Sequence, residues 1–376
     1  MLVAAGLERD PVVSRAAQGL RDAVLGAAGR RIVRLVAPWP DGRRWAAAFT
    51  HDLDVVAWWP IFAGARAAEL ARKGEWTQLF GAAGAGLRAL TGDPVLDGVR
   101  GLVEAEQELS IASTWFVLCG SPTRRTFVAG DLTYAPESPR ARAAYATILA
   151  AGDEIGLHGS FATMESADEL RAQRERLSGI VGRDSRGVRQ HFLRMRPGST
   201  QRAMAGAGFR YDSTYGFPDR NGFRLGVADV VPTWDAAEQR VSVLEQAPLV
   251  WMDRALSKYR GVEDPSAWVD DALELAELCR GLEGLWVGLW HPNLTPALGY
   301  PGAPAEYERL ATAIARSEPY IAPLERIVAW RSARRSVRAH GVAADGRVFA
   351  RIGAESLDTP VVLEDASGRP METAAK

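Results

Sequence analysis

Short apolar runs alternate with longer helical patterns along most of the chain. The runs at 45–51, 112–119 and 284–290 are largely apolar and have the length of strands that are buried on both faces. The segments between them are rich in Ala, Leu, Arg and Glu, as at 138–151 and 265–280, and have the composition and length of helices. Strands that alternate with helices in this way predict an α/β fold whose parallel sheet forms a barrel.

The two ends of the chain do not follow this rhythm. Residues 1–44 are polar and rich in Arg, and we predict that they pack as an extension on the main domain. Residues 332–376 alternate Val and Arg with Gly and Asp, and their Asp345-Gly346 pair is typical of a tight turn between antiparallel strands. The sequence therefore predicts an N-terminal extension, a barrel domain over 45–331 and a small β-rich C-terminal appendage.

Composition and charge exclude several classes of protein. The formal net charge is −1 over 376 residues, which leaves no basic footprint of the kind that nucleic-acid binding requires. Cys119 and Cys279 lie far apart and outside any Cys-x-x-Cys pattern, which excludes a disulfide framework and a multi-thiolate zinc site. The N-terminus lacks the pattern of a secretory signal, and no apolar stretch approaches the ~20 residues of a membrane span. We therefore expect a cytoplasmic protein without a transmembrane segment, and the sequence does not indicate its oligomeric state.

Four of the five histidines lie in short clusters with other polar residues. Each cluster closes or follows a predicted strand. Because the carboxyl ends of barrel strands converge on one cavity, we expect these side chains to form a single polar site. Histidine together with carboxylate is the combination that a catalytic divalent metal and its acid–base partners require. The clusters are Thr50-His51-Asp52-Leu53-Asp54, Leu157-His158-Gly159-Ser160, Arg189-Gln190-His191 and Trp290-His291-Pro292.

Structural roles are also compatible with some of these residues. Asp52 and Asp54 could cap the helix that follows them, because Asp is common at helix N-termini. His51 should point away from Asp52, since successive side chains of a strand face opposite sides, and we leave it out of the ligand set. Glu245 and Asp253 could equally be ion-pair partners of Arg254 or Arg189 at the barrel rim.

Several motifs, in this order and spacing, resemble one enzyme family. Over roughly 45–330 the chain is similar to the polysaccharide deacetylases, carbohydrate esterase family 4, in a divergent branch whose first motif is Thr-His-Asp-x-Asp. The resemblance implies a distorted (β/α)7–8 barrel of the polysaccharide deacetylase type. The matching segments are Thr50–Asp54, Ser113-Thr-Trp-Phe-Val117, Glu154-Ile-Gly-Leu-His158, Arg189-Gln-His-Phe-Leu-Arg194, Val243-Leu-Glu245 with Met252-Asp253, and Leu289-Trp-His291-Pro292.

The resemblance also implies a role for each matched residue. Asp52 corresponds to the catalytic base and Asp54 to a metal ligand. His158 corresponds to a second metal ligand, Arg189 to the arginine that holds the base, and His291 to the histidine that protonates the leaving amine.

The third metal ligand departs from the family pattern. The usual second motif places another histidine four residues after the first, and here that position is Ala162. His191 could replace it, because alternation along a strand would put His191 on the same face as Arg189. The implied cofactor is a divalent metal, with zinc as the first candidate and cobalt or nickel as alternatives that the same ligand types accept.

These features predict a metal-dependent hydrolase that removes N-acetyl or other N-acyl groups from an amino sugar or glycan precursor, with a linear amide C–N bond as its target. One alternative is a hydrolase of a non-glycan amide bond on the same barrel. Another is a catalytically silent barrel that binds a glycan or a protein. The discriminating feature is whether a complete three-ligand site forms around Asp54 and His158.

Overall fold

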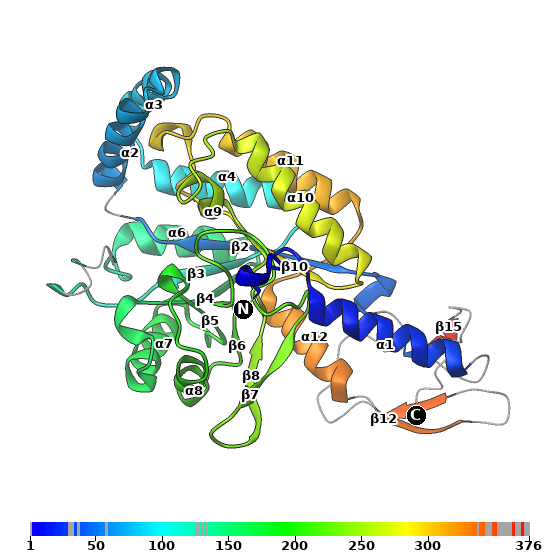
Figure 1. The fold of residues 1–376 in the computed structure, drawn as a ribbon. Coiled ribbons are helices and arrows are strands. Elements are labelled where there is room, and N and C mark those ends of the chain that lie inside the picture. The colour runs from blue at the N-terminus through cyan, green and yellow to red at the C-terminus, as the bar shows by residue number, and fades with distance from the viewer. Residues whose placement is uncertain are drawn as a thin grey trace.

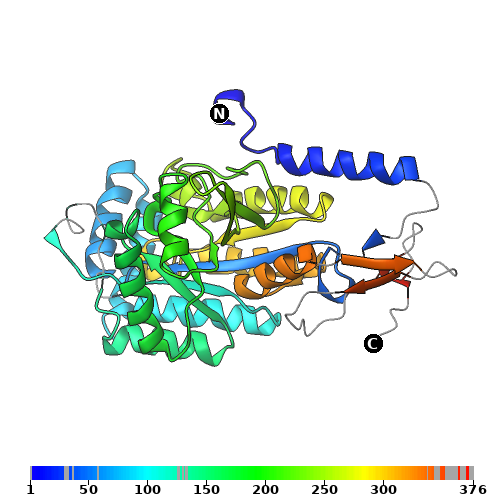
Figure 2. The ribbon, with the colours of Figure 1, turned by 90° about the horizontal axis from the view of Figure 1, so that it is seen from below.

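The computed structural model describes residues 2–28, 34–35, 38–56, 59–124, 128, 131, 134–336, 338–342, 348–351, 363–364 and 370–371. Its centre is a ten-stranded sheet surrounded by helices (Figures 1 and 2). The strands of this sheet are β2 (Ala46–Leu53), β3 (Thr114–Leu118), β4 (Glu154–Gly159), β5 (Gly187–Gln190), β6 (Tyr211–Asp212), β7 (Val231–Asp235), β8 (Arg240–Gln246), β9 (Trp251–Met252), β10 (Leu285–Leu289) and β11 (Tyr320–Ile321).

The helices connect these strands and cover the sheet (Figure 1). They are α1 (Val12–Ala28), α2 (Trp59–Lys73), α3 (Trp76–Ala89), α4 (Pro94–Glu108), α6 (Pro139–Ala150), α7 (Ala167–Val181), α8 (Ser199–Gly206), α9 (Asp253–Ser257), α10 (Pro265–Gly281), α11 (Ala303–Arg316) and α12 (Leu324–Ser336). Short 3-10 turns η4 (Phe161–Thr163), η5 (His191–Leu193) and η6 (Pro296–Leu298) lie in the connections.

The sheet is an open, mostly parallel barrel. Its strands follow the order β7-β8-β6-β5-β4-β3-β2-β10-β9, with β11 beside β2. Every neighbouring pair is parallel except β7 and β8. Within the described residues no strand pairing joins β7 to β9, so the barrel stays open there. The predicted α/β class and the distorted barrel are confirmed.

Three strands of the sheet form where the sequence is largely apolar. All eight residues of β2 are buried, and β3, β4, β5 and β10 are buried along their whole length as well. Parallel strands that are covered on both faces need such runs, because neither face meets water. The runs at 45–51, 112–119 and 284–290 thus correspond to β2, β3 and β10.

The amino ends of the strands carry a buried polar cluster of their own. Glu154, the first residue of β4, accepts hydrogen bonds from Thr114 Oγ1 at 2.9 Å, from Tyr211 Oη at 2.6 Å and from the backbone N–H of Glu325 at 3.0 Å. These bonds tie three strands to the first turn of α12. Burial raises the pKa of Glu154 above its ordinary value, although the hydrogen bonds from Tyr211 and the Glu325 backbone oppose this effect.

The ends of the chain also contact the body or pair among themselves. Arg9 lies 2.6 Å from Asp271, and the backbone N–H of Ala228 donates to Ser14 Oγ at 3.0 Å. Near the other end, β12 (Arg338–Val342) and β13 (Val348–Arg351) pair antiparallel, as do β1 (Arg34–Leu35) with β14 (Leu363–Glu364) and β14 with β15 (Pro370–Met371). The predicted Asp345-Gly346 turn lies outside the described residues. The three-part division of the chain stays a prediction.

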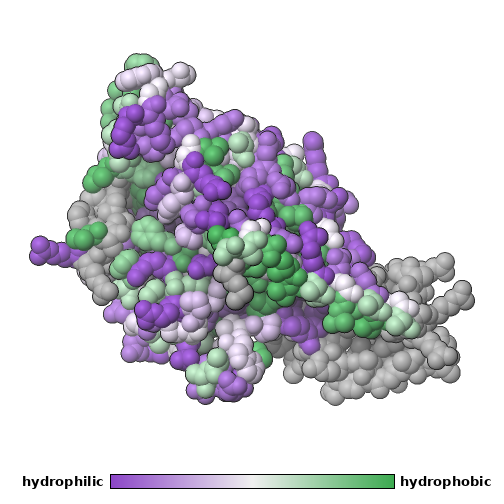
Figure 3. All heavy atoms as spheres, viewed as in Figure 1, coloured by the Kyte–Doolittle hydropathy of each residue, from purple (hydrophilic) through white to green (hydrophobic). Residues whose placement is uncertain are grey.

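Helices α2 and α3 project from the upper edge of the body in Figure 1. Several large apolar side chains on them are exposed: Ile61, Trp76, Phe80 and Leu87. The face drawn in Figure 3 is mostly hydrophilic, and its broadest hydrophobic area lies near the centre of the view. Among the described helices, none combines the length and the apolar composition needed to cross a bilayer.

Candidate metal centre and catalytic pocket

The predicted polar residues meet at the carboxyl edge of the sheet. Asp52 lies near the end of β2 and Asp54 follows that strand directly, while His158 lies on β4 beside Arg189 of β5. His291 follows β10, which is the other neighbour of β2. The structure therefore brings all six predicted site residues to one place, with His191 at the start of η5.

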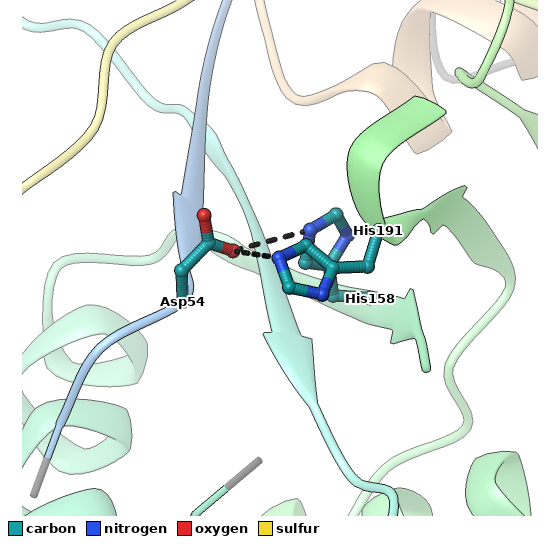
Figure 4. Close-up of side chains that lie close together, drawn as sticks. All are labelled: Asp54, His158 and His191. Carbon is teal, nitrogen blue, oxygen red and sulfur yellow. Dashed lines mark ion pairs between the residues drawn. The ribbon is translucent and has the colours of Figure 1, made fainter. Parts of the chain in front are cut away.

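Three of these side chains form a candidate metal centre (Figure 4). Asp54 Oδ1 lies 3.2 Å from His158 Nε2 and 3.7 Å from His191 Nε2. One ligand atom from each residue can be chosen so that all lie within 4.8 Å of one another. A divalent ion bound at ~2.0–2.2 Å from nitrogen and oxygen ligands fits between atoms at such separations. Asp54 Oδ1 is also buried without a hydrogen-bond partner, a cost that a bound cation would remove.

Both imidazole rings are held with Nε2 toward Asp54. His158 Nδ1 lies 2.8 Å from the carbonyl oxygen of Arg189, and His191 Nδ1 lies 2.9 Å from Asp131 Oδ1. Because each Nδ1–H donates to an oxygen, each Nε2 keeps its lone pair for a metal. The three residues thus fit a divalent cation in donor type, tautomer and spacing.

Asp131 is a site residue that sequence reasoning missed. It is buried, and its Oδ2 accepts a 2.6 Å hydrogen bond from the backbone N–H of Phe161 while Oδ1 holds His191. A carboxylate behind a ligating histidine orients the ring and makes it a stronger ligand. A single Asp in an irregular connection has no periodicity and no motif, so only the fold reveals this contact.

Asp52 is held by the predicted arginine. Arg189 Nη1 donates to Asp52 Oδ1 at 2.8 Å, while Nε and Nη2 donate to the carbonyl and Oγ of Ser213 at 3.2 and 2.9 Å. The guanidinium is fully buried and lies 4.4 Å from the centre of the Phe116 ring. Among the described residues no hydrogen bond reaches Asp52 Oδ2, which lies 3.6 Å from His158 Nε2. One oxygen of this carboxylate is therefore fixed and the other is available for chemistry.

His291 lies on the other side of Asp54. Asp253 accepts from both His291 Nδ1, at 2.7 Å, and the His291 backbone N–H, at 2.6 Å, and His291 Nε2 lies 3.6 Å from Asp54 Oδ2. Burial works to lower the pKa of His291, but the charges of Asp253 and Asp54 outweigh it and raise this pKa above the ordinary value. The imidazole can therefore hold a proton on Nε2 near neutral pH.

The imidazoles act on Asp54 in return. When no ion is bound and the rings are protonated, His191, followed by His158 and His291, holds the pKa of this carboxyl well below its ordinary range against the effect of burial. Asp54 is consequently ionised throughout the neutral range, as a metal ligand must be.

The rim partners proposed for Asp253 and Glu245 differ from those in the structure. Asp253 binds His291 and does not pair with Arg254 or Arg189, whereas Glu245 pairs with Arg335. Asp253 is thus part of the site, because the chain folds β9 beside β10.

His51 faces away from this cavity, as alternation along β2 predicts. Its Nδ1 lies 2.7 Å from the carbonyl oxygen of Trp290 and its Nε2 lies 2.9 Å from Glu106 Oε1, all of them buried. His51 therefore lies behind the segment that carries His291 and hydrogen-bonds to the backbone of that segment.

The position of the missing histidine contributes nothing to the site. Ala162 lies in η4 and is exposed, and the second imidazole comes from His191 on the next strand connection. Directly after His191, Phe192 and Leu193 have φ values of +59° and +50°, and the Phe192 ring stacks on His191 at 3.8 Å. Two consecutive left-handed residues without glycine cost about 1–3 kcal/mol each, so the rest of the fold imposes this turn. The strand along which we expected Arg189 and His191 to alternate ends at Gln190, so His191 lies just beyond it.

A cavity of about 200 Å³ opens over these residues. Asp52, Asp54 and the three histidines form its polar floor, and Phe62, Phe192, Met252 and Tyr259 contribute apolar and aromatic walls. Arg254, Lys258 and Asn293 complete its polar lining.

Comparison with known proteins gives a fold but no close relative. No family model matches the chain, and no curated protein matches its sequence. A solved structure from Mycobacterium smegmatis, classed as a polysaccharide deacetylase, is 21% identical, covers 81% of this chain and 96% of its own, and has a TM-score of 0.53. Two further structures have TM-scores just under 0.5. One from Pseudomonas aeruginosa PAO1, classed likewise, is 16% identical over 79% of this chain and 93% of its own, with a TM-score of 0.49. The PuuE allantoinase is 14% identical, covers 78% of this chain and 92% of its own, and has a TM-score of 0.48.

The first of these comparisons carries the fold assignment. This chain has the polysaccharide deacetylase fold, and the family resemblance found in the sequence agrees with it.

Proposed function

We propose that this protein is a metal-dependent hydrolase that removes an N-acetyl or other N-acyl group from an amino sugar or glycan precursor. The observation that carries the proposal is the convergence of Asp54, His158 and His191 around an unpartnered carboxylate oxygen, next to the Arg189–Asp52 pair. The likeness of the fold to a structure classed as a polysaccharide deacetylase supports it.

Asp54, His158 and His191 would hold the ion, with zinc as the first candidate. When bound, such an ion polarises an acyl carbonyl and lowers the pKa of water at its open positions. Asp52 acts as the general base: its free Oδ2 takes a proton from the attacking water while Arg189 fixes Oδ1.

His291 acts as the general acid. Asp253 holds Nδ1–H, so that a proton on Nε2 faces the cavity, where it is delivered to the departing amine nitrogen. The C–N bond breaks, and the products are the free carboxylate, acetate for an N-acetyl substrate, and the amino sugar.

Metal analysis followed by assay tests the proposal. The untagged protein should contain or take up about one ion per chain, and hydrolysis of acetamido sugars should stop after chelation and return with zinc, cobalt or nickel. No binding after dialysis against zinc would refute the metal site. One bound ion without turnover of any acetamido sugar would favour the silent binding barrel or a hydrolase of another amide.

A further inference from the structure

Two cations on one helical turn face the candidate metal centre. Arg254 lies in α9 and Lys258 follows the last residue of that helix, and both line the cavity that Asp54 and His291 share. Residues four apart in helical backbone lie on the same side, so the two cations act on the same part of the cavity.

Neither cation has an acidic partner. Among the described residues no carboxylate lies within 4 Å of Arg254 or Lys258, although Arg66 nearby pairs with both Glu69 and Glu263. Arg254 Nη1 donates to Tyr300 Oη at 2.7 Å, and Lys258 Nζ lies 5.3 Å from the centre of the Tyr259 ring. Most of the guanidinium N–H groups and all of the ammonium N–H groups therefore remain for a ligand.

The charges that line the cavity also favour an anionic ligand. The acidic groups that line it are Asp52 and Asp54, and Arg189 already neutralises the first. A divalent ion would carry more positive charge than Asp54 alone can balance. Together with Arg254 and Lys258, it would leave the cavity positively charged. Lys258 is an exposed residue that lines the cavity, and partial desolvation followed by repulsion from Arg254 lowers its pKa.

We propose that Arg254 and Lys258 form a subsite for an anionic oxygen group, a phosphate or a carboxylate, on the acylated amino sugar. This inference rests on the proposed function and names the substrate class within it. Arginine suits the task because its planar N–H groups bind two oxygens of a phosphate or carboxylate at once, while lysine adds a mobile charge. The anion would anchor the sugar while its acyl group lies over the metal centre.

The test uses three sugars of different charge. They are N-acetylglucosamine, its 1-phosphate and N-acetylmuramic acid, which carries a carboxylate. Their affinities are measured by calorimetry on the zinc-loaded Asp52→Asn protein, where hydrolysis is blocked, and on the metal-free protein, where phosphate cannot bind to the ion. At least one anionic sugar should bind at least ~10-fold more tightly than the neutral sugar in both forms, as charge-assisted hydrogen bonds predict. The tighter of the two anionic sugars identifies phosphate or carboxylate as the anchor.

Matched variants assign the preference to the two cations. Lys258→Gln should remove most of this preference, because KM for the anionic sugar should rise far more than KM for the neutral sugar. Arg254→Gln should act in the same direction and Arg254→Lys should restore part of the preference. Arg260→Gln, an exposed neighbour outside the cavity lining, should change nothing.

The outcomes separate this inference from the proposed function. Equal affinity for neutral and anionic sugars, or an equal loss for both in Lys258→Gln, would overturn the subsite. If an anionic preference depends on Lys258 but no sugar is hydrolysed, the subsite stands and the deacylase proposal fails.

Discussion

Two buried carboxylates at opposite ends of the same sheet have opposite surroundings. Glu154, at the amino end, receives three hydrogen bonds from neutral donors, and burial raises its pKa. Asp54, at the carboxyl end, has an oxygen with no hydrogen-bond donor and faces three imidazoles that lower its pKa. Hydrogen bonds satisfy the Glu154 carboxyl, whereas the unpartnered oxygen of Asp54 can accept a cation.

This difference separates a structural acid from a functional one more clearly than burial does. A satisfied polar group fixes the packing around it, and at the amino ends of barrel strands such groups contribute stability. A buried oxygen without a hydrogen bond, next to side chains that can ligate a metal, carries an energetic cost that a bound ion would remove. Substitutions at the two ends should therefore have different consequences.

The largest effect is expected from His158→Ala. Loss of a direct ligand should weaken zinc binding by more than the ~10–100-fold that loss of an outer partner causes, and hydrolysis should fall to background. Competition with a chromophoric chelator measures the affinity, with Glu154→Gln as a buried control that keeps its metal. A His158→Ala protein that still holds one tight zinc would remove this residue from the ligand set.

Asp52→Asn should separate the base from the ligands. The amide keeps an oxygen for Arg189 but cannot take a proton, so kcat should fall ~10²–10⁴-fold while the metal content stays the same. Steady-state kinetics measure kcat, and elemental analysis of the same preparation measures the metal content. Ordinary turnover in this variant would contradict the base assignment.

Asp131→Asn tests the partner that sequence reasoning missed. Without the carboxylate behind His191, zinc affinity should drop by ~10–100-fold, and activity should recover when excess zinc is added. Asp168→Asn is the matched control, because that carboxylate is 92% exposed and pairs with Arg171 on the same helix. Identical zinc titrations for the two variants would exclude a role for Asp131.

Asp253→Asn should change the pH dependence. The charge of Asp253 raises the pKa of His291, so the protonated acid of the wild type persists to higher pH and kcat/KM falls only as the pH rises through that raised value. Without this charge the pKa drops, and the alkaline limb of the profile should move to lower pH. An unmoved limb, at equal metal content, would mean that another group is the acid.

The smallest effect on catalysis is expected at the other end of the sheet. Glu154→Gln leaves donors such as Tyr211 and Thr114 poorly matched, which should lower the free energy of unfolding by about 1–3 kcal/mol. Denaturant unfolding measures this loss, while kcat and zinc content at 25 °C should remain those of the wild type. Lost zinc binding would show that the two clusters are coupled across the sheet.

Much of this protein could be predicted from the order of its residues. The apolar runs that became β2, β3 and β10 are local patterns, and buried parallel strands need little else. Asp52, His158 and Arg189 lie near the carboxyl ends of parallel strands and Asp54 follows one of them, so their convergence follows from the parallel topology. The outward orientation of His51 required only the two-residue period of a strand.

Tertiary structure decided how the site is completed. His191 supplies the second imidazole because the chain turns through two left-handed residues after β5, a conformation that no local preference of Phe192 or Leu193 would favour. Asp131 and Asp253 reach their histidines across 60 and 38 positions of sequence. Arg254 and Lys258 face the metal centre only because β9 pairs with β10. Sequence patterns report short-range preferences, whereas hydrogen bonds and charge balance in a buried site depend on segments that become neighbours only when the chain folds.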